Sequence, residues 1–260
     1  MKKLFFLSRA IKDIYSLWKN DLSLFEKSSF TYSLFSLKIK KWLLKPDRLI
    51  GVKIFGKTWY GLNDGDYQFL VKEIFIKKVY AFDMENNASI VIGDFGANIG
   101  LSSLFFSCYY PNATIKAYEP NKSSFLLLQK NVLKNKLKQI EIFQNAVAGS
   151  NKKMYPLKGF KDYSLNQSFL ITDEDNEEDI EAISILNLLD LVHFDVIKLD
   201  IEGMEIEVLD ALIDQKKLVN VHYWIIEFHN NNKIQDYLNV FREEGFKYFT
   251  KENIYHFKLN

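Results

Sequence analysis

The 260-residue chain contains one cysteine, four prolines and four histidines. A single cysteine excludes an intramolecular disulfide, which fits a reducing compartment. Its aromatic neighbours Phe105, Phe106 and Tyr109 favour a packing role for the Cys108 thiol. No zinc-type spacing exists among the histidines, which stand at positions 193, 222, 229 and 256.

Long apolar runs and an excess of one charge are also missing. The formal net charge of +1 provides no global field that would recruit nucleic acid, and no Asn-Pro-Pro-Tyr-type base-flipping motif is present. The apolar run 4–7 is shorter than the roughly seven residues that a secretory signal core needs. No segment approaches the ~18 apolar residues of a membrane span. These absences predict a cytoplasmic protein that does not act on nucleic acid.

The composition, with 48% hydrophobic and 26% charged residues, is that of a globular protein. We expect an N-terminal helical and hairpin extension, residues 1–80, before a main domain, residues 81–260. Residues 1–50 carry eleven Lys and Arg against four Asp and Glu. Apolar residues recur at helical spacing over residues 1–45, in one stripe from Leu4 to Trp18 and a second through Phe30, Leu34, Leu37 and Trp42.

Two interpretations of residues 1–45 stay open. A helical lid or dimerisation arm would pack on the main domain or form a homo-oligomer. A basic, aromatic-rich helix would instead make a peripheral contact with the inner face of a membrane, near a lipid-linked substrate. Further on, Val52–Phe55 and Thr58–Leu62 predict a hairpin around Gly56-Lys57, and residues 66–80 predict a helix.

Beyond Ser89, short apolar runs alternate with helical patterns, which is typical of a parallel sheet with crossover helices. Residues 150–182 break the alternation, and the seven acids among residues 173–181 predict a solvated loop. The predicted strands are 90–92, 114–118, 140–143, 196–199, 224–228, 246–249 and 254–259.

The most informative stretch is Ile90–Gly100, a buried strand that enters a tight turn before an apolar helix. Glycines in such a turn let backbone N–H groups approach a ligand. Glu119 ends the next strand, where a carboxylate can accept both ribose hydroxyls of a nucleotide-like cofactor. The turn residues are Asp94, Gly96, Asn98 and Gly100.

The spacing of this turn differs from the Gly-x-Gly-x-x-Gly pattern that fits a pyrophosphate. The leading Asp94 would repel phosphate and suits a cationic ligand such as the α-ammonium of S-adenosylmethionine. This favours S-adenosylmethionine over a nicotinamide cofactor. An NAD-dependent oxidoreductase is the less favoured enzyme, and a structural turn without a ligand is the plain alternative.

Acidic residues also follow two later strands. Asp200 ends a buried strand at the ligand edge of the sheet, where an unpaired carboxylate would be costly. Glu205 fits a structural role at a helix N-terminus, and Glu202 fits either role. Alternation along a strand places Glu227 and His229 on the same side of the last parallel strand.

These motifs resemble the FkbM family of S-adenosylmethionine-dependent methyltransferases over residues 90–229. The resemblance lies in Asp94-Phe-Gly-Ala-Asn-Ile-Gly100, Glu119-Pro120, Asn145-Ala146, Lys198-Leu-Asp-Ile-Glu-Gly-Met-Glu205 and Ile226-Glu-Phe-His229. It implies a class I methyltransferase fold, a Rossmann-like, seven-stranded, mainly parallel sheet whose last strand is antiparallel. It also implies O-methylation, with sugars of surface glycans and natural-product hydroxyls as common acceptors.

Carried onto this chain, the resemblance implies that Glu119 holds the ribose, Asn145 sits by the adenine and Asp200 borders the methionine end and the acceptor. The residues that would line the methionine moiety are Asp94, Gly96, Ala97, Asn98 and Gly100.

For catalysis, an acceptor hydroxyl benefits from a base within hydrogen-bond reach. His229 is the first candidate, and Asp200 or Glu202 the second. Alternatively, Asp200, Glu227 and His229 would hold Mg²⁺ or Mn²⁺ and lower the pKa of the hydroxyl. A non-catalytic, S-adenosylmethionine-binding scaffold is a further alternative, and the sequence does not identify the acceptor.

Overall fold

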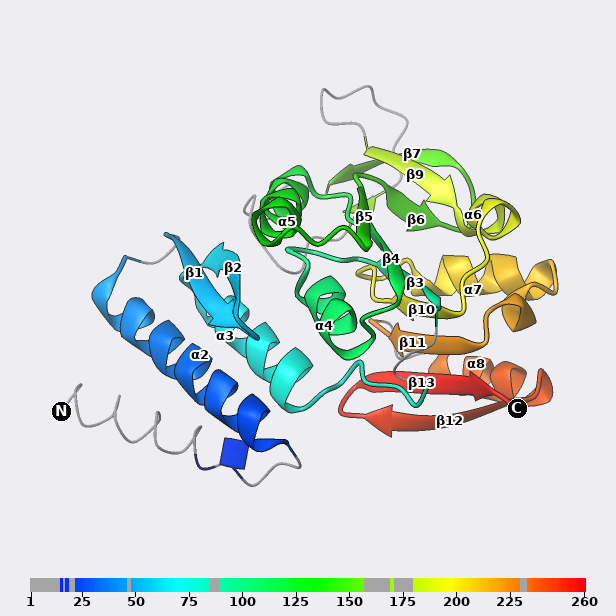
Figure 1. The fold of residues 1–260 in the computed structure, drawn as a ribbon. Helices are drawn as coiled ribbons and strands as arrows, with labels where there is room; N and C mark the ends of the chain where they lie inside the picture. The colour runs from blue at the N-terminus through cyan, green and yellow to red at the C-terminus, as the bar shows by residue number, and fades with distance from the viewer. Residues whose placement is uncertain are drawn as a thin grey trace. The chain divides into compact units, whose positions relative to one another are not determined.

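The computed structural model describes residues 15, 17–18, 22–45, 48–84, 89–156, 169–170, 180–229 and 233–260. Two compact units are present, one formed by residues 1–79 with 129–136 and the other by residues 80–128 with 137–260 (Figure 1). The division into two domains at residue 80 stays a prediction, and most of the expected first helix lies outside the described residues.

In the first unit, helix α2 (Leu24–Leu43) begins at a capping box in which Ser23 and Glu26 bond each other's backbone N–H. The predicted stripe of Phe30, Leu34 and Leu37 is buried, as expected for an amphipathic helix. Trp42, which continues the stripe in sequence, is 55% exposed. The last turn of α2 therefore does not follow the buried face.

The predicted hairpin is formed by the antiparallel strands β1 (Leu49–Ile54) and β2 (Lys57–Leu62). Its two-residue turn is Phe55-Gly56, with φ of 48° and 77°, rather than Gly56-Lys57. Helix α3 (Gly65–Val71) follows and continues as a π-helix, η1 (Lys72–Ile76). The prediction of a helix reaching Tyr80 is wrong at its end, because the chain leaves helical geometry after Ile76.

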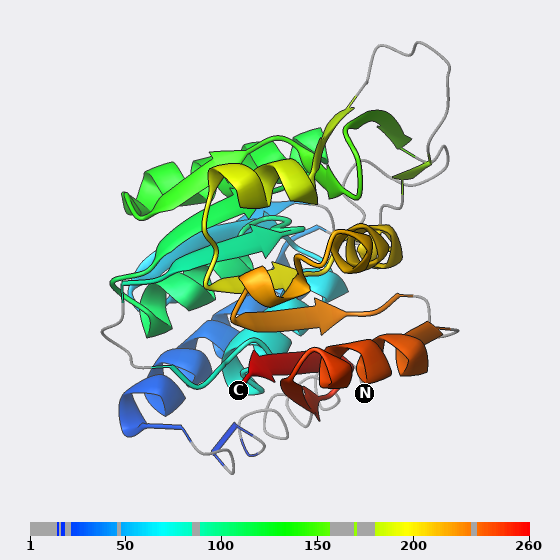
Figure 2. The same ribbon diagram turned by 90° about the vertical axis from the view of Figure 1, so that its right-hand side faces the viewer.

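The second unit contains a seven-stranded sheet in the order β12-β13-β11-β10-β3-β4-β5. Five strands pair in parallel from β11 to β5, whereas β13 is antiparallel to both of its neighbours. Figure 2 shows the red β13 arrow opposed to the orange β11 arrow. This arrangement confirms the predicted class I methyltransferase fold. The strands are β3 (Val91–Phe95), β4 (Thr114–Tyr118), β5 (Ile140–Phe143), β10 (Val196–Leu199), β11 (Tyr223–Glu227), β12 (Phe246–Lys251) and β13 (Ile254–Leu259).

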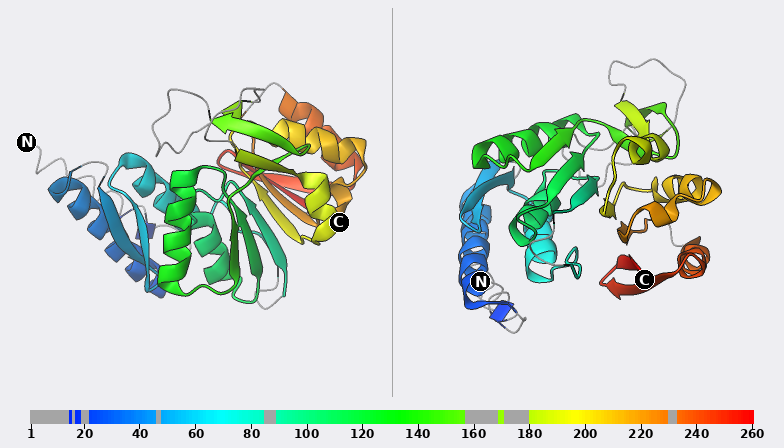
Figure 3. Two further views of the ribbon diagram at one scale, coloured as in Figure 1. Left: turned by 90° about the horizontal axis from the view of Figure 1, so that it is seen from above. Right: turned by 45° about the vertical axis from the view of Figure 1, so that its right-hand side comes forward.

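Helices cover both faces of this sheet (Figures 1 and 3). On one face, α6 (Ile185–Leu191), α7 (Glu205–Asp214) and α8 (Ile234–Glu243) share a hydrophobic core with the strands. On the other lie α4 (Leu101–Tyr109) and the first half of α5 (Lys122–Asn135). The core includes the fully buried side chains of Leu199, Val208, Trp224 and Phe241. This packing fixes the positions of the loops that follow the parallel strands.

A second, four-stranded sheet in the order β6-β9-β7-β8 includes parts of the segment 150–182, which breaks the alternation of strands and helices. Its strands are β6 (Ala146–Ala148), β7 (Lys152–Pro156), β8 (Phe169–Leu170) and β9 (Ile180–Ser184). The loop predicted for residues 173–181 is wrong at residues 180–181, which belong to β9, while residues 173–179 lie outside the described part of the chain. No helix in the described ranges has the length and apolar character needed to cross a membrane.

Candidate functional site

A glycine turn follows β3 at the carboxyl edge of the sheet. Gly96, Asn98 and Gly100 all have positive φ, of 76°, 50° and 87°. The N–H groups of Gly96 and Ala97 donate to the Tyr118 carbonyl at 3.0 and 2.9 Å. A Cβ at Gly96 would stand 1.7 Å from the Asp200 carbonyl oxygen. Glycine is therefore required at position 96 both by the backbone conformation and by the close approach of a second loop.

Glu119 follows β4 and is tied to this turn. Its carboxylate oxygens accept hydrogen bonds from the N–H groups of Asn98 and Asn121, both at 2.8 Å. The side chain is buried, and burial raises the pKa of Glu119 to about 7, although both backbone hydrogen bonds oppose the shift. The turn and the end of β4 thus form one hydrogen-bonded unit at the edge of the sheet.

Asp94, which was expected to face a cationic ligand, lies fully buried beneath the turn. One carboxylate oxygen accepts from the hydroxyls of Ser102 and Ser103 at 2.7 and 2.5 Å. The other pairs with the Lys198 ammonium at 3.3 Å. The contacts of Asp94 within the described chain therefore support the N-terminus of α4 and the end of β10.

Lys198 joins the first and fourth parallel strands at the site. Its ammonium is almost completely buried, donates to the Gly96 carbonyl at 2.7 Å and pairs with Asp200 at 3.2 Å as well as with Asp94. Burial lowers the pKa of Lys198, but the charges of Asp200 and Asp94 outweigh that effect and raise it above its usual value. Lys198 is therefore a permanent cation beneath the turn.

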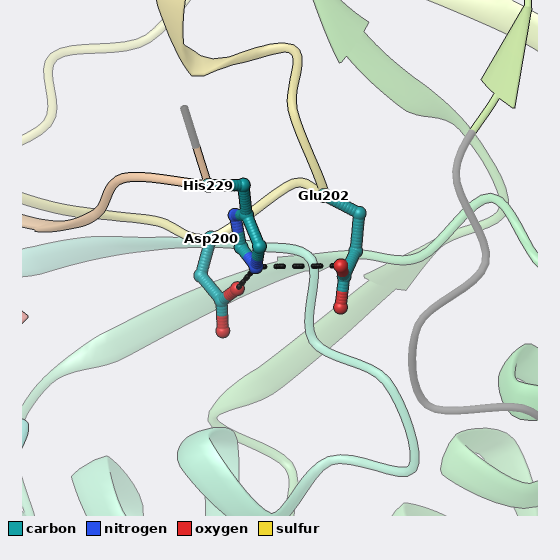
Figure 4. A group of neighbouring side chains, drawn as sticks. All are labelled: Asp200, Glu202 and His229. Carbon is teal, nitrogen blue, oxygen red and sulfur yellow. Dashed lines mark ion pairs between the residues drawn. The ribbon is translucent and has the colours of Figure 1, made fainter. Parts of the chain in front are cut away.

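Asp200, Glu202 and His229 converge on one point beyond β10 and β11 (Figure 4). The Nε2 atom of His229 lies 3.3 Å from Glu202 Oε2 and 3.9 Å from Asp200 Oδ1. These are the described residues whose ligand-type atoms gather within 4.8 Å of one another. The three predicted catalytic residues thus meet at one place, which we call the Asp200–Glu202–His229 cluster.

Glu205 orients the imidazole of His229 through the ring nitrogen that faces away from the cluster. The Nδ1 atom of His229 lies 3.0 Å from Glu205 Oε1, and Glu205 also accepts from the N–H groups of Ile201 and Gly203. Burial lowers the pKa of His229, but the hydrogen bond with Glu205 and the charges of Glu205, Asp200 and Glu202 together outweigh it and raise the pKa to about 9. Burial raises the pKa of Glu202 to about 7. His229 is therefore predominantly protonated at neutral pH, while Glu202 changes its protonation state near neutral pH.

Glu227 does not belong to this cluster, which corrects the predicted metal-ligand set. Its carboxylate accepts a hydrogen bond from Asn253, and Glu202 occupies the place expected for it. The alternation argument failed because β11 ends at Glu227, so His229 lies on backbone that is no longer a strand. Asn145 stands between β5 and β6, where its amide donates to the Glu181 carbonyl at 3.4 Å.

Three residues of the site were not identified as functional from the sequence. Lys198 interrupts an otherwise apolar strand, and this is a signal of a buried charge partner. Glu205 was recognised only as a helix acid, although it orients His229. Tyr80, whose hydroxyl donates to Asp200 Oδ2 at 3.1 Å, carries no sequence signal because it lies 120 residues away.

Comparison with known proteins agrees with this geometry. The sequence profile described as the methyltransferase FkbM domain matches residues 94–248, which is more than half of the chain. Methyltransferase sdnD of Sordaria araneosa is 27% identical over 238 residues, covering 78% of this chain and 87% of sdnD. The 31-O-demethyl-FK506 methyltransferase FkbM of Streptomyces tacrolimicus is 35% identical over 83 residues, 32% of each chain.

Among solved structures, methyltransferase FkbM from Methylobacillus flagellatus KT matches with a TM-score of 0.48 and 13% identity. The match covers 96% of this chain, which spans 59% of that one. Because this profile matches more than half of its length, the chain belongs to the FkbM family of S-adenosylmethionine-dependent methyltransferases.

Proposed function

We propose that this protein transfers a methyl group from S-adenosylmethionine to a hydroxyl oxygen of a sugar in a surface glycan or of a natural product. The single observation that carries the proposal is the hydrogen bond from the Asn98 N–H to Glu119, which joins the glycine turn to the end of the next strand. Support for an oxygen acceptor comes from the Streptomyces relative, whose name specifies a 31-O-demethyl substrate.

The residues present fit S-adenosylmethionine. The Asp200 carbonyl lies where a Cβ of Gly96 would stand, so the glycine turn and the Asp200 loop pack together with no side chain between them. In our proposal Glu119 accepts from the ribose hydroxyls, Asn145 lies by the adenine, and the turn residues border the methionine moiety. Asp94 pairs with Lys198, and Lys198 in turn donates to the Gly96 carbonyl, so Asp94 supports the turn through Lys198.

The acceptor side of the proposed site is the Asp200–Glu202–His229 cluster. When bound, S-adenosylmethionine supplies an electrophilic methyl group, so the protein mainly has to orient the hydroxyl and accept its proton. Because the pKa of His229 is raised to about 9, its imidazole is protonated at neutral pH and is disfavoured as the base. The Glu202 carboxylate, with a pKa of about 7, retains the capacity to accept a proton.

Calorimetric titration with S-adenosylhomocysteine, the product of methyl transfer, tests the cofactor assignment. Glu119→Ala removes charge-assisted hydrogen bonds and should weaken binding by about 10- to 100-fold. Glu141→Ala is the matched control, because Glu141 is a partly exposed acid on the adjacent strand β5 whose partner is Lys116. Equal affinities of both variants would contradict the role of Glu119.

The same titration with NADH separates the alternatives. Saturable NADH binding without S-adenosylhomocysteine binding would favour an oxidoreductase. If S-adenosylhomocysteine binds but no hydroxyl acceptor yields it from S-adenosylmethionine, the non-catalytic scaffold would be favoured. A panel of sugar nucleotides, glycans and polyketide alcohols, with release of S-adenosylhomocysteine as the readout, covers the proposed acceptor class.

The exposed face of α2 favours a peripheral membrane contact. Phe25, Tyr32, Phe35 and Trp42 recur at intervals of seven, three and seven residues and are 66%, 59%, 49% and 55% exposed. Because this aromatic face lies in the basic N-terminal fifty residues, we propose an anionic lipid surface as its partner.

Co-sedimentation with phosphatidylserine vesicles should be lost on Phe35→Ser and retained on Phe69→Ser, an exposed aromatic on α3. Wild-type protein that dimerises without binding these vesicles would instead support the dimerisation arm.

A further inference from the structure

The Asp200–Glu202–His229 cluster has the composition of a cation site. Two carboxylates and an imidazole face one another with their ligand atoms all within 4.8 Å, and His229 Nε2 lies 3.3 and 3.9 Å from Glu202 and Asp200 (Figure 4). Around an octahedral ion with bonds of about 2.1 Å, adjacent ligand atoms are about 3 Å apart and opposite ones about 4.2 Å. The two separations between His229 Nε2 and the carboxylates therefore lie in the range that one ion would impose.

The imidazole is held in the orientation that a metal ligand needs. Its Nδ1 atom faces Glu205 Oε1, so the Nε2 atom points toward Asp200 and Glu202. Glu205 is 1% exposed and is itself fixed by the backbone N–H groups of Ile201 and Gly203. A carboxylate on the far nitrogen is the usual arrangement around metal-binding histidines, because it sets the tautomer and the direction of the ring.

The charges around the cluster also favour a cation. Among the described residues, Asp200, Glu202 and Glu205 lie together with one lysine, Lys198, which is shared with the buried Asp94. The Lys198 ammonium and the Tyr80 hydroxyl both contact Asp200 Oδ2. The Oδ1 atom faces His229 instead, so one oxygen of Asp200 is directed into the cluster.

Partial exposure allows an ion to enter. The side chains of Asp200, Glu202 and His229 are 20%, 25% and 29% exposed, in contrast to the buried Glu205 behind them. The site is therefore open on one side, where water or an acceptor hydroxyl could complete the coordination of an ion.

We propose that Asp200 Oδ1, Glu202 Oε2 and His229 Nε2 bind one divalent cation of the Mn²⁺ or Mg²⁺ type. Two carboxylate oxygens suit a hard cation, and the imidazole favours Mn²⁺ over Mg²⁺. Binding requires a neutral His229 and so displaces its proton. Cation binding itself does not depend on the proposed function. The consequence for catalysis does rest on it: a bound cation would acidify the acceptor hydroxyl, with Glu202 as a ligand in place of a base.

Mn²⁺ binding to the full chain, after treatment with EDTA and removal of the chelator, tests the proposal without any activity measurement. Titration followed by the loss of the free Mn²⁺ electron paramagnetic resonance signal should give one saturable site per chain. Glu202→Gln and His229→Gln should each weaken it by more than the 10- to 100-fold typical of outer-shell changes, and Glu205→Gln by about that amount.

Glu227→Gln is the matched control, since Glu227 bonds Asn253 outside the cluster and should leave Mn²⁺ affinity unchanged. Thermal unfolding verifies that each variant is folded, and a variant that fails this check is replaced by Glu202→Asp or His229→Asn. The proposal is overturned if the wild type shows no saturable Mn²⁺ binding at millimolar concentration. It is also overturned if Glu227→Gln loses as much affinity as His229→Gln.

Titration of S-adenosylhomocysteine in the presence of EDTA separates this result from the proposed function. Mn²⁺ binding without S-adenosylhomocysteine binding would support the cation site and contradict the methyltransferase assignment. S-adenosylhomocysteine binding without Mn²⁺ binding would support the methyltransferase assignment, contradict the cation site and leave Glu202 as the candidate base.

Discussion

Gly96→Ala should destabilise the second unit far more than the same change at other positive-φ glycines. Gly96 has φ of 76°, and its added Cβ would lie 1.7 Å from the Asp200 carbonyl oxygen. Gly245 has φ of 91°, and its nearest atom would be 3.9 Å away. Both substitutions therefore force alanine into a left-handed conformation, but only Gly96→Ala also collides with backbone.

The conformational strain alone costs about 1–2 kcal/mol, which both variants share. Relief of the collision at Gly96 requires the turn or the Asp200 loop to move by more than about 1 Å, and such overpacking adds about 1–3 kcal/mol or more. For a unit of this size, each kcal/mol lowers Tm by about 2–4 °C. We therefore expect Gly245→Ala to lower Tm by about 2–8 °C and Gly96→Ala by about 4–20 °C, always by more than Gly245→Ala.

Thermal unfolding followed by circular dichroism measures both changes under the same conditions. Gly56→Ala provides a second control, since its φ of 77° nearly equals that of Gly96 and no atom lies within 4 Å of its Cβ. Gly56 belongs to the first unit, so it measures the cost of alanine in this backbone conformation outside the unit that contains the site. If Gly96→Ala unfolds within 1 °C of Gly245→Ala, the approach of the two loops is not as described.

The remaining predictions concern the buried charges of the site. Ribose hydroxyls donate to an ionised carboxylate, so the affinity for S-adenosylhomocysteine should fall as the pH drops below about 7, the pKa of Glu119. The decrease should reach up to about tenfold per pH unit. Calorimetry should show no such pH dependence in Glu119→Gln. Lys198→Met leaves two carboxylates without their cation and should lower the free energy of unfolding, measured in urea, by about 3–5 kcal/mol. Lys116→Met, at a partly exposed ion pair, should lower it by less than about 1 kcal/mol. Similar values for the two variants would refute the buried pairing. Tyr80→Phe removes one hydrogen bond to Asp200 and should cost about 1 kcal/mol in the same assay, whereas no change would place the Tyr80 hydroxyl elsewhere.

The strand pattern made the positions of the site residues predictable. Asp94, Glu119 and Asp200 each lie at or just past the end of a short apolar strand, and parallel strands bring such ends to one edge. The partner of Asp94 was not predictable, because Lys198 opposes it only when β10 pairs with β3. That pairing joins strands about one hundred residues apart, and local periodicity contains no information about it.

Short elements and strand ends limited what else could be predicted from the sequence. Strand β6 has three residues and is too short to show a period, so the sequence pattern did not predict the small sheet. The predicted pairing of Glu227 with His229 assumed that alternation continues beyond the last ladder residue, which it does not. The motif Asp200-Ile-Glu-Gly-Met-Glu205 nevertheless contained the correct second carboxylate, Glu202.

The sharing of one ammonium by Asp94 and Asp200 links the two halves of the site thermodynamically. A cation that binds Asp200 neutralises part of its charge and weakens its attraction for Lys198, so the ammonium interacts relatively more strongly with Asp94 and the Gly96 carbonyl. That shift alters the underside of the turn that we assign to the cofactor. Because such coupling is reciprocal, we expect cation and cofactor to change each other's affinity by the same factor. Each half of the site would then still bind its own ligand, with an affinity that depends on whether the other half is occupied.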